Sequence, residues 1–188
     1  MCIRDRGEPD FNTPEHVKQA GIEAIQENYS HYTGMVGDPE LREAAQHFFK
    51  TKYATDYAAE DEILVTVGAT EALATAITTI SDPGDAMLVP SPIYPGYIPL
   101  LTLNHVTPIY MDTSKTNFVL TPALIEATIA AHPDAKIKGI ILNYPSNPTG
   151  VTYRASEVKA IAATAAEHDL YIICDEIYSE LTYGDSHV

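Results

Sequence analysis

Short apolar runs alternate along this chain with longer stretches in which apolar residues recur three and four positions apart. A continuous apolar run is typical of a strand covered on both faces of a sheet, and the longer spacing is typical of an amphipathic helix. We therefore expect strands at residues 63–67, 86–89, 106–111, 137–142 and 171–174. The expected helices begin near residues 13, 38, 68, 96, 121 and 156.

Three of these helices follow the same start signal, a Thr or Asp directly before proline. The side-chain oxygen can cap free backbone N–H groups, and proline suits the first helical position because its φ is fixed near the helical value. Thr13, Asp38 and Thr121 are the expected N-caps. Strands that alternate with long helices indicate βαβ units. The pattern predicts an α/β fold with a mostly parallel sheet and helices on both faces, in three layers.

Size, charge and cysteine content narrow the function classes. The 188 residues suffice for one domain with a real core, and we find no internal repeat or convincing linker. The net charge of −15 argues against binding to nucleic acid or to an anionic membrane, because both need clusters of Lys and Arg. No apolar stretch approaches the length of a membrane span. Cys2 and Cys174 make neither a disulfide framework nor a metal site, and the expected location is cytoplasmic.

The two ends of the chain lack the patterning of the rest. Residues 1–6 show neither helical nor strand periodicity, and residues 181–188 stop without a terminating element. We hypothesise that the chain is a gene fragment and that residues 1–6 are a spurious leader.

Polar side chains follow two of the expected strands where those strands end. Asn143–Gly150 comes after strand 137–142, and Asp175–Tyr178 comes after strand 171–174. Open α/β sheets bind ligands in the crevice at the carboxyl ends of their strands. A carboxylate, a phenol and a carboxamide that converge there suit a flat heteroaromatic cofactor. Gly68–Thr70 lies at a strand-to-helix junction, where free N–H groups and the helix dipole attract anions.

Six motifs in one order resemble the class I/II aminotransferases, pyridoxal-phosphate enzymes of fold type I in the aspartate aminotransferase family. The motifs are Gly7–Phe11, His31–Thr33, Gly68–Leu73, Tyr94–Tyr97, Asn147–Gly150 and Asp175–Tyr178. The resemblance implies an N-terminal arm at residues 1–12 and an incomplete large, cofactor-binding domain at residues 13–188. It also implies a role in amino-acid metabolism and biosynthesis.

The resemblance assigns roles around the cofactor ring. It implies that Asp175 bonds to the pyridine nitrogen and keeps it protonated, so that the ring acts as an electron sink. Tyr178 and Asn147 are implied to bond to the phenolic oxygen, and Gly68, Ala69 and Thr70 to hold the phosphate. Taken alone, Asp175 equally suits a turn cap, Asn147 a turn residue before a proline, and the glycine segment a helix start without a ligand.

Aromatic and glycine residues complete the implied site. Tyr94 matches the aromatic residue that stacks on the pyridine ring, with Tyr97 as the competitor in the same loop. Tyr32 resembles a tyrosine that reaches the phosphate of the neighbouring subunit, which implies a homodimer with shared active sites. Gly7 matches a glycine whose backbone approaches the substrate carboxylate.

The lysine that the family needs is missing from this chain. That lysine forms the Schiff base with the cofactor and then acts as the base, and in the family it lies well after the aspartate–tyrosine motif. The lysines here are Lys18, Lys50, Lys52, Lys115, Lys136, Lys138 and Lys159, and none follows Asp175. The arginine that pairs with the substrate α-carboxylate is missing too. As given, the chain is expected to be inactive.

Several functional readings stay open. The leading one is the N-terminal part of an aminotransferase that moves an amino group between an amino acid and a 2-oxo acid. A carbon–sulfur lyase that catalyses β-elimination with the same cofactor is the alternative. A non-catalytic pyridoxal-phosphate-binding homologue, such as a regulator, is the third reading, and a dinucleotide-binding domain is a distant fourth because no Gly-x-Gly-x-x-Gly follows the first strand. Donor and acceptor are not specified by the sequence; aspartate, alanine and aromatic substrates all remain open.

Overall fold

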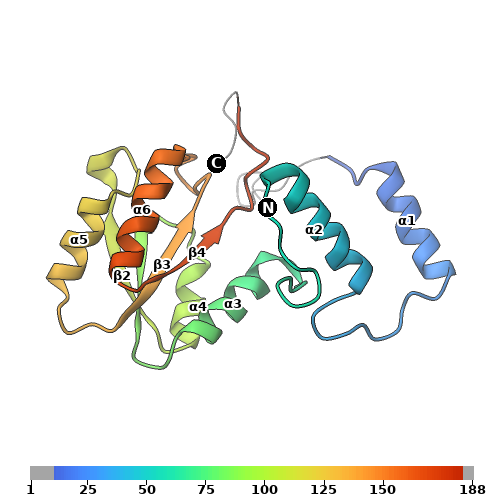
Figure 1. The fold of residues 1–188 in the computed structure, drawn as a ribbon, viewed down its shortest axis with the longest axis horizontal. Coiled ribbons are helices and arrows are strands. Elements are labelled where there is room, and N and C mark those ends of the chain that lie inside the picture. The colour runs from blue at the N-terminus through green and yellow to red at the C-terminus, as the bar shows by residue number, and fades with distance from the viewer. Residues whose placement is uncertain (1–10, 184–188) are drawn as a thin grey trace, which may run out of the picture. The chain divides into compact units, whose positions relative to one another are not determined.

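The computed structural model describes residues 11–183, and the chain divides between Val65 and Thr66 into two compact units. Figure 1 shows the first unit as two helices with their connecting loops and the second as a sheet flanked by helices. Whether residues 13–188 form a single domain stays a prediction.

The first unit contains α1 (Glu15–Gln26) and α2 (Pro39–Tyr53). The prediction for α2 is confirmed, because the Asp38 carboxylate accepts a hydrogen bond of 2.9 Å from the backbone N–H of Glu40. The predicted cap of α1 is wrong: Pro14 occupies the N-cap position, and no side chain caps this helix. Because Pro14 is the N-cap, Thr13 lies one residue before the capping position, and its hydroxyl does not cap the first turn of α1.

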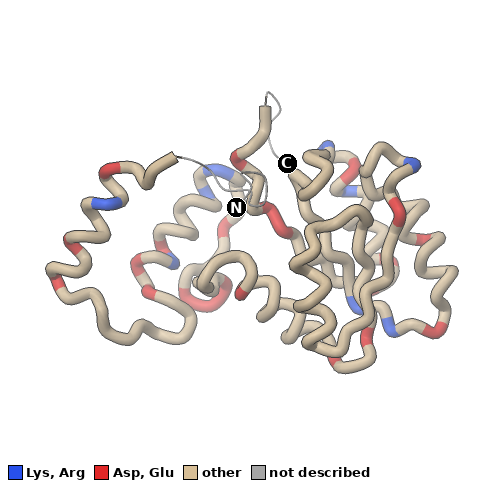
Figure 2. The backbone as a smooth tube through the Cα atoms, turned by 180° about the vertical axis from the view of Figure 1, so that it is seen from behind, with Lys and Arg blue, Asp and Glu red and all other residues tan. Residues whose placement is uncertain are grey.

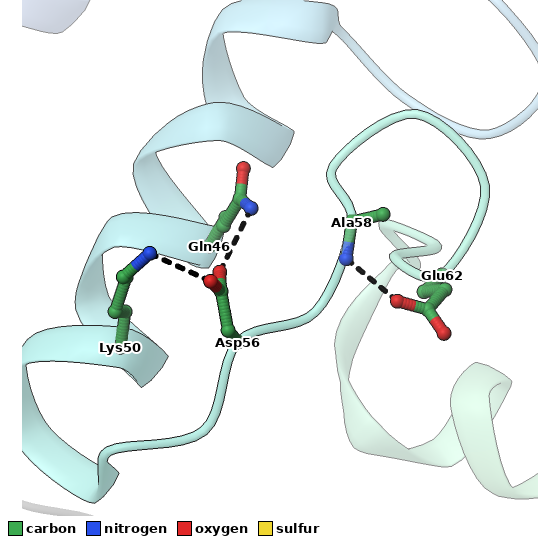
Figure 3. Close-up of polar contacts among 5 residues, drawn as sticks. All are labelled: Gln46, Lys50, Asp56, Ala58 and Glu62. Atoms are coloured by element: carbon green, nitrogen blue, oxygen red, sulfur yellow. Dashed lines mark hydrogen bonds and ion pairs between the residues drawn. The ribbon is translucent and has the colours of Figure 1, made fainter.

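The loop after α2 is held against that helix by polar contacts (Figure 3). Asp56 accepts a hydrogen bond of 2.6 Å from Lys50 Nζ and one of 3.1 Å from Gln46 Nε2. Further along, the Glu62 carboxylate accepts a 2.7 Å bond from the backbone N–H of Ala58. These contacts close the loop into a compact turn on the C-terminal half of α2.

The hydrogen bond from Lys50 is the main cause that lowers the pKa of Asp56, followed by the bond from Gln46. A carboxyl group whose pKa is lowered by folding stabilises the folded state above its unfolded pKa, and this contribution is lost as the pH falls through the folded-state value. We expect Lys50→Met to raise the pKa of Asp56 towards its ordinary value, measured by an NMR pH titration. Lys159→Met is the control. An unchanged Asp56 titration in Lys50→Met would show that Lys50 does not set this pKa.

The second unit is a four-stranded parallel sheet in the order β2-β1-β3-β4. Its elements follow the predicted alternation closely. They are α3 (Gly68–Ile80), β1 (Ala86–Ser91), α4 (Tyr97–Leu103), β2 (Thr107–Asp112), a 3-10 turn (Ser114–Thr116), α5 (Pro122–Ala131), β3 (Ile137–Asn143), α6 (Ala155–Glu167) and β4 (Tyr171–Asp175). The predicted cap of α5 is confirmed, because the Thr121 hydroxyl accepts a bond from the Leu124 N–H.

Helices cover both faces of this sheet, as Figure 1 shows, and two apolar clusters fill the spaces between the layers. Residues of α5 and α6, such as Ile125 and Ile161, pack with Leu88 and Ile140 on one face. On the other face, residues of α3 and α4 pack with side chains such as Ile141. The predicted three-layer α/β fold with a parallel sheet is confirmed.

The strand predicted at residues 63–67 is absent from the described structure. The segment is apolar, but a strand needs a neighbouring strand as partner for its backbone groups. Here the Val65 N–H bonds to the carbonyl of Val36, while the other backbone bonds of the segment are local, from the Val67 N–H to Glu71 and from the Gly68 N–H to the Thr66 carbonyl. Leu64 and Val67 are exposed. The prediction of a strand at residues 63–67 is therefore wrong for the described residues 11–183, where no strand pairs with this segment.

Charged residues are spread along both units. Figure 2 shows Asp and Glu at scattered positions on helices and loops, with the fewer Lys and Arg placed between them. In the part of the chain that the structure describes, no helix is both long enough and apolar enough to cross a membrane.

Candidate cofactor site

A pocket of about 160 Å³ lies in the second unit at the C-terminal ends of β3 and β4, beside the start of α3. The structure brings together six of the residues predicted from the sequence: Ala69, Thr70, Tyr94, Asn147, Asp175 and Tyr178. Leu73, Tyr97, Asn143 and Ile177 complete the lining. The convergence follows from the sheet, because β3 and β4 are parallel and in register, so that both strands end at the same edge.

Asp175 is the last residue of β4 and is buried, with 9% of its surface exposed. Its Oδ2 accepts a hydrogen bond of 2.6 Å from the Tyr97 hydroxyl, and its Oδ1 accepts a bond of 3.2 Å from the backbone N–H of Ile177. These two donors fix the plane of the carboxylate. Each oxygen keeps a further lone pair for another donor.

Tyr97 is the first residue of α4, and its side chain is almost fully buried. Burial raises the pKa of Tyr97, and the hydrogen bond to Asp175 raises it further, so that the phenol stays neutral and acts as the donor. The Tyr94 ring packs edge-on against Tyr97 with ring centres 5.5 Å apart. Gly96 makes this packing possible, because a Cβ there would overlap the Tyr94 ring.

Removing the Tyr97 hydroxyl is expected to destabilise the second unit. Tyr97→Phe leaves a buried carboxylate without one of its two donors, and a hydrogen bond to a charged group contributes about 1.5–3 kcal/mol. We expect a loss of that size in the free energy of unfolding, measured by urea denaturation. Tyr110→Phe, on the exposed part of edge strand β2, is the matched control. Equal stability of the two variants would contradict the assigned role of this hydrogen bond.

Tyr178 and Asn147 reach the pocket from two different loops. The chain turns directly after β4, with hydrogen bonds from the Ser179 N–H to the Glu176 carbonyl and from the Leu181 N–H to the Tyr178 carbonyl. This turn brings Tyr178 to the same pocket as Asp175. Asn147 lies in the loop after β3, where its backbone N–H is held at 2.8 Å by the side chain of Asn143.

The N-terminus of α3 has the features of an anion site. Gly68 has a φ of 77°, a conformation that favours glycine, and a Cβ there would meet no atom within 4 Å. Val67 occupies the N-cap position and provides no side-chain cap. The Gly68 N–H donates to the Thr66 carbonyl, so the N–H groups of Ala69 and Thr70 are the ones at the helix start that face an anion without a capping side chain. The Glu71 carboxylate bonds to the N–H of Val67, ahead of the helix. Ala69 and Thr70 line the pocket at this end.

The charge balance of the pocket fits a protonated ring. Buried carboxylates are normally paired with a cation, yet no Lys, Arg or His within residues 11–183 forms an ion pair with Asp175. A heteroaromatic ring that carries a proton on its nitrogen would supply the missing positive charge. The uncapped start of α3 would receive an anionic group on the same ligand.

The pocket is not the largest hollow of the second unit. A wider one of about 660 Å³ lies at the opposite edge of the sheet, near the first residues of β1 and β2. Its lining includes His132, Asp134 and Lys136 but none of the motif residues. The convergence of polar side chains at the strand ends, and not volume, distinguishes the candidate site.

The two groups that lie close to Glu176, the thiol of Cys174 on β4 and the phenol of Tyr144 directly after β3, carry no charge at neutral pH. Desolvation of its sulfur raises the pKa of Cys174 to about 11, helped by the nearby Glu176, although the residue as a whole is exposed. Burial also raises the pKa of Tyr144, whose hydroxyl donates a 3.3 Å hydrogen bond to Glu176 Oε1. The thiol and this phenol therefore stay protonated.

Three predicted site residues are not part of the pocket lining. Gly68 is the residue directly before Ala69 at the start of α3, and its own atoms do not line the pocket. Tyr32 belongs to the first unit, where its side chain is fully exposed, and its predicted contact with a neighbouring subunit stays a prediction. Gly7 lies outside the described residues.

Two residues of the pocket, Tyr97 and Asn143, were not assigned these contacts from the sequence. The sequence presents Tyr97 only as an alternative to Tyr94 for ring stacking. The available signal was its spacing of three residues from Tyr94, which lets both side chains face the same pocket at the start of a helix. Asn143 is the last residue of β3, and its position at the carboxyl end of a strand was the available signal.

Comparison with known proteins agrees with the fold and the motifs. The family of class I and II aminotransferases matches residues 5–188. A probable N-acetyl-LL-diaminopimelate aminotransferase of Bacillus subtilis is 46% identical over 96% of this chain and 45% of its own length. An aspartate aminotransferase of Geobacillus stearothermophilus is 38% identical over 95% of this chain and 44% of its own length.

Solved structures give the same picture. The aspartate aminotransferase of Rhizobium meliloti superposes with a TM-score of 0.91 at 33% identity, covering 97% of this chain and 45% of that protein. The chain thus spans a little under half the length of these relatives. The matched residues, the parallel sheet and the identity to several relatives show that the chain belongs to the class I and II aminotransferases, a family of pyridoxal-phosphate enzymes.

Proposed function

We propose that this chain supplies the N-terminal part of a pyridoxal-phosphate-dependent aminotransferase that moves an amino group between an amino acid and a 2-oxo acid. The observation that carries the proposal is the buried carboxylate of Asp175, which has two hydrogen-bond donors and no cationic partner within residues 11–183. The membership in the family and the convergence of its motifs in one pocket support it.

Each pocket residue has a role in this proposal. Asp175 accepts a hydrogen bond from the ring nitrogen and holds the proton there. Asn147 and Tyr178 donate to the phenolic oxygen, and Tyr94 covers one face of the ring. The backbone N–H groups at Gly68–Thr70 bind the phosphate. When bound, the cofactor supplies an electron sink for the negative charge that develops at the substrate Cα as its proton leaves.

The remaining parts of the machinery are assigned to the rest of the full-length protein. The proposal places there the lysine that binds the cofactor covalently and moves the Cα proton, and the arginine that pairs with the substrate carboxylate. It also includes a homodimer in which Tyr32 contacts the cofactor phosphate of the partner subunit, and Gly7 next to the substrate carboxylate.

The names of the relatives suggest which donors to test first. One relative is named for N-acetyl-LL-diaminopimelate and another for aspartate. We propose an amino acid with a second carboxylate as donor, in a panel with L-aspartate, L-glutamate, L-alanine, L-phenylalanine and N-acetyl-LL-diaminopimelate.

The test is a steady-state assay of the full-length protein with each donor, with and without an acceptor. The acceptor is 2-oxoglutarate, replaced by oxaloacetate when L-glutamate is the donor. An aminotransferase forms the 2-oxo acid of the donor only when an acceptor is present, and it releases no ammonia. L-cystathionine is included because a carbon–sulfur lyase would release ammonia from it without any acceptor. Ammonia release of that kind, or no turnover of any donor, would contradict the proposal.

A further inference from the structure

The side chain of Asn143 bonds to both of the loops that provide ring contacts. Its Nδ2 donates a 2.8 Å hydrogen bond to the backbone carbonyl of Asp175. Its Oδ1 accepts a 2.8 Å hydrogen bond from the backbone N–H of Asn147. Both ends of one amide group are thus in use, one on each motif.

The register of the sheet explains why one side chain can span the two loops. Asn143 ends β3 and Asp175 ends β4, and these residues are direct partners across the two parallel strands. The loop after β3 then folds back, so that Asn147 lies within reach of the Asn143 side chain four positions earlier. Asn143 is half-buried and lines the same pocket as the other two residues.

A pyridine ring sets a strict requirement on these two loops. In pyridoxal phosphate the ring nitrogen and the carbon that carries the phenolic oxygen are separated by a single ring carbon, so the two polar groups keep a constant separation. An acceptor on one loop and a donor on the other satisfy both groups only when the two loops are held at a matching separation. Errors of about 1 Å in such placements can cost about 10²-fold in function.

We infer that Asn143 is a positioning residue that sets the spacing between Asp175 and Asn147, so that both reach the cofactor ring at once. The inference rests on the proposed function. The backbone N–H of Tyr144 also donates to the Asp175 carbonyl, at 3.2 Å, so β4 keeps its place when the Asn143 amide is removed. The Asn147 N–H, in contrast, loses its side-chain acceptor.

The experiment compares two ligands in variants of the full-length protein. Pyridoxal phosphate makes both ring contacts, whereas 3-deoxypyridoxal phosphate lacks the phenolic oxygen and cannot use Asn147. Asn143→Ala removes both hydrogen bonds of the bridge. We expect it to weaken binding of pyridoxal phosphate by about 10- to 30-fold and binding of the deoxy analogue by less than about 3-fold.

Two further variants sharpen this comparison. Asn143→Asp keeps the acceptor for the Asn147 N–H and loses the donor to the Asp175 carbonyl. We therefore expect a smaller loss of pyridoxal-phosphate affinity than in Asn143→Ala, again with little change in the affinity for the deoxy analogue. Asn104 is the matched control, because its amide also joins two elements, donating to the Leu100 carbonyl and accepting from the Thr78 hydroxyl. Asn104→Ala is expected to leave the ratio of the two affinities unchanged.

The possible results distinguish a failure of the role inferred for Asn143 from a failure of the proposed function. Equal losses for both ligands in Asn143→Ala and Asn143→Asp would show a general structural role and overturn the inference while leaving the proposed function intact. A wild-type protein that binds neither ligand would overturn both. Should Asn143→Ala not fold, the ligand ratio in Asn143→Asp decides the matter.

Discussion

Asp175→Asn in the full-length protein is expected to lower kcat for amino transfer by about 10²–10³-fold, the size of effect seen when one preorganised electrostatic contact to a reacting group is removed. The carboxylate is the buried group that can hold a proton on the ring nitrogen, and an amide has no negative charge with which to do so. Without that proton the ring is a weaker electron sink for the reacting Cα. The measurement is kcat with saturating donor, acceptor and cofactor.

The control for this prediction must carry the same chemical change. Asp169→Asn alters an exposed aspartate in the turn before β4, at a φ of 54° that asparagine tolerates well. We expect kcat within about twofold of wild type for this variant, because surface substitutions away from the site have small effects. An Asp175→Asn enzyme as active as the control would contradict the assigned role of Asp175.

Ile140→Ala is expected to lower the free energy of unfolding by about 2–5 kcal/mol, the range for removing a large aliphatic side chain from a packed core. Ile140 lies in β3, an interior strand of the sheet, and is fully buried in the cluster beneath α5 and α6. The truncated side chain leaves a cavity that the strands on either side cannot close. Chemical denaturation, followed by circular dichroism, measures the loss.

Leu103→Ala separates this core effect from a general effect of truncation. Leu103 ends α4 and is 77% exposed, so that its replacement removes little buried surface. A change within about 0.5 kcal/mol is expected there. Similar losses for the two variants would mean that the sheet core described here does not dominate the stability of the second unit.

Much of the second unit could be predicted from the sequence, because its elements are stabilised by local signals. Thr121 before a proline marked the start of α5, and continuous apolar runs marked β1, β3 and β4. The strand expected at residues 63–67 failed because strand formation depends on a partner that no local pattern can show. The prediction that Thr13 caps α1 was wrong because the helix starts one residue later than expected, with Pro14 as its N-cap.

The candidate site shows the same division between local and long-range information. The convergence of Asp175, at the end of β4, and Asn147, in the loop just after β3, was predictable because parallel strands bring their carboxyl ends to one edge. The contact between Tyr97 and Asp175 joins residues 78 positions apart and depends on how α4 packs on the sheet. The bridge formed by Asn143 depends on the path of a loop. Neither leaves a periodic signal in the sequence.

A crystal structure of the full-length protein with pyridoxal phosphate tests the central claim most directly. Our account predicts the ring nitrogen within hydrogen-bond distance of the Asp175 carboxylate, the phenolic oxygen beside Asn147 and Tyr178, and the phosphate at the start of α3. A cofactor bound elsewhere, or a ring nitrogen that contacts no atom of Asp175, would contradict it.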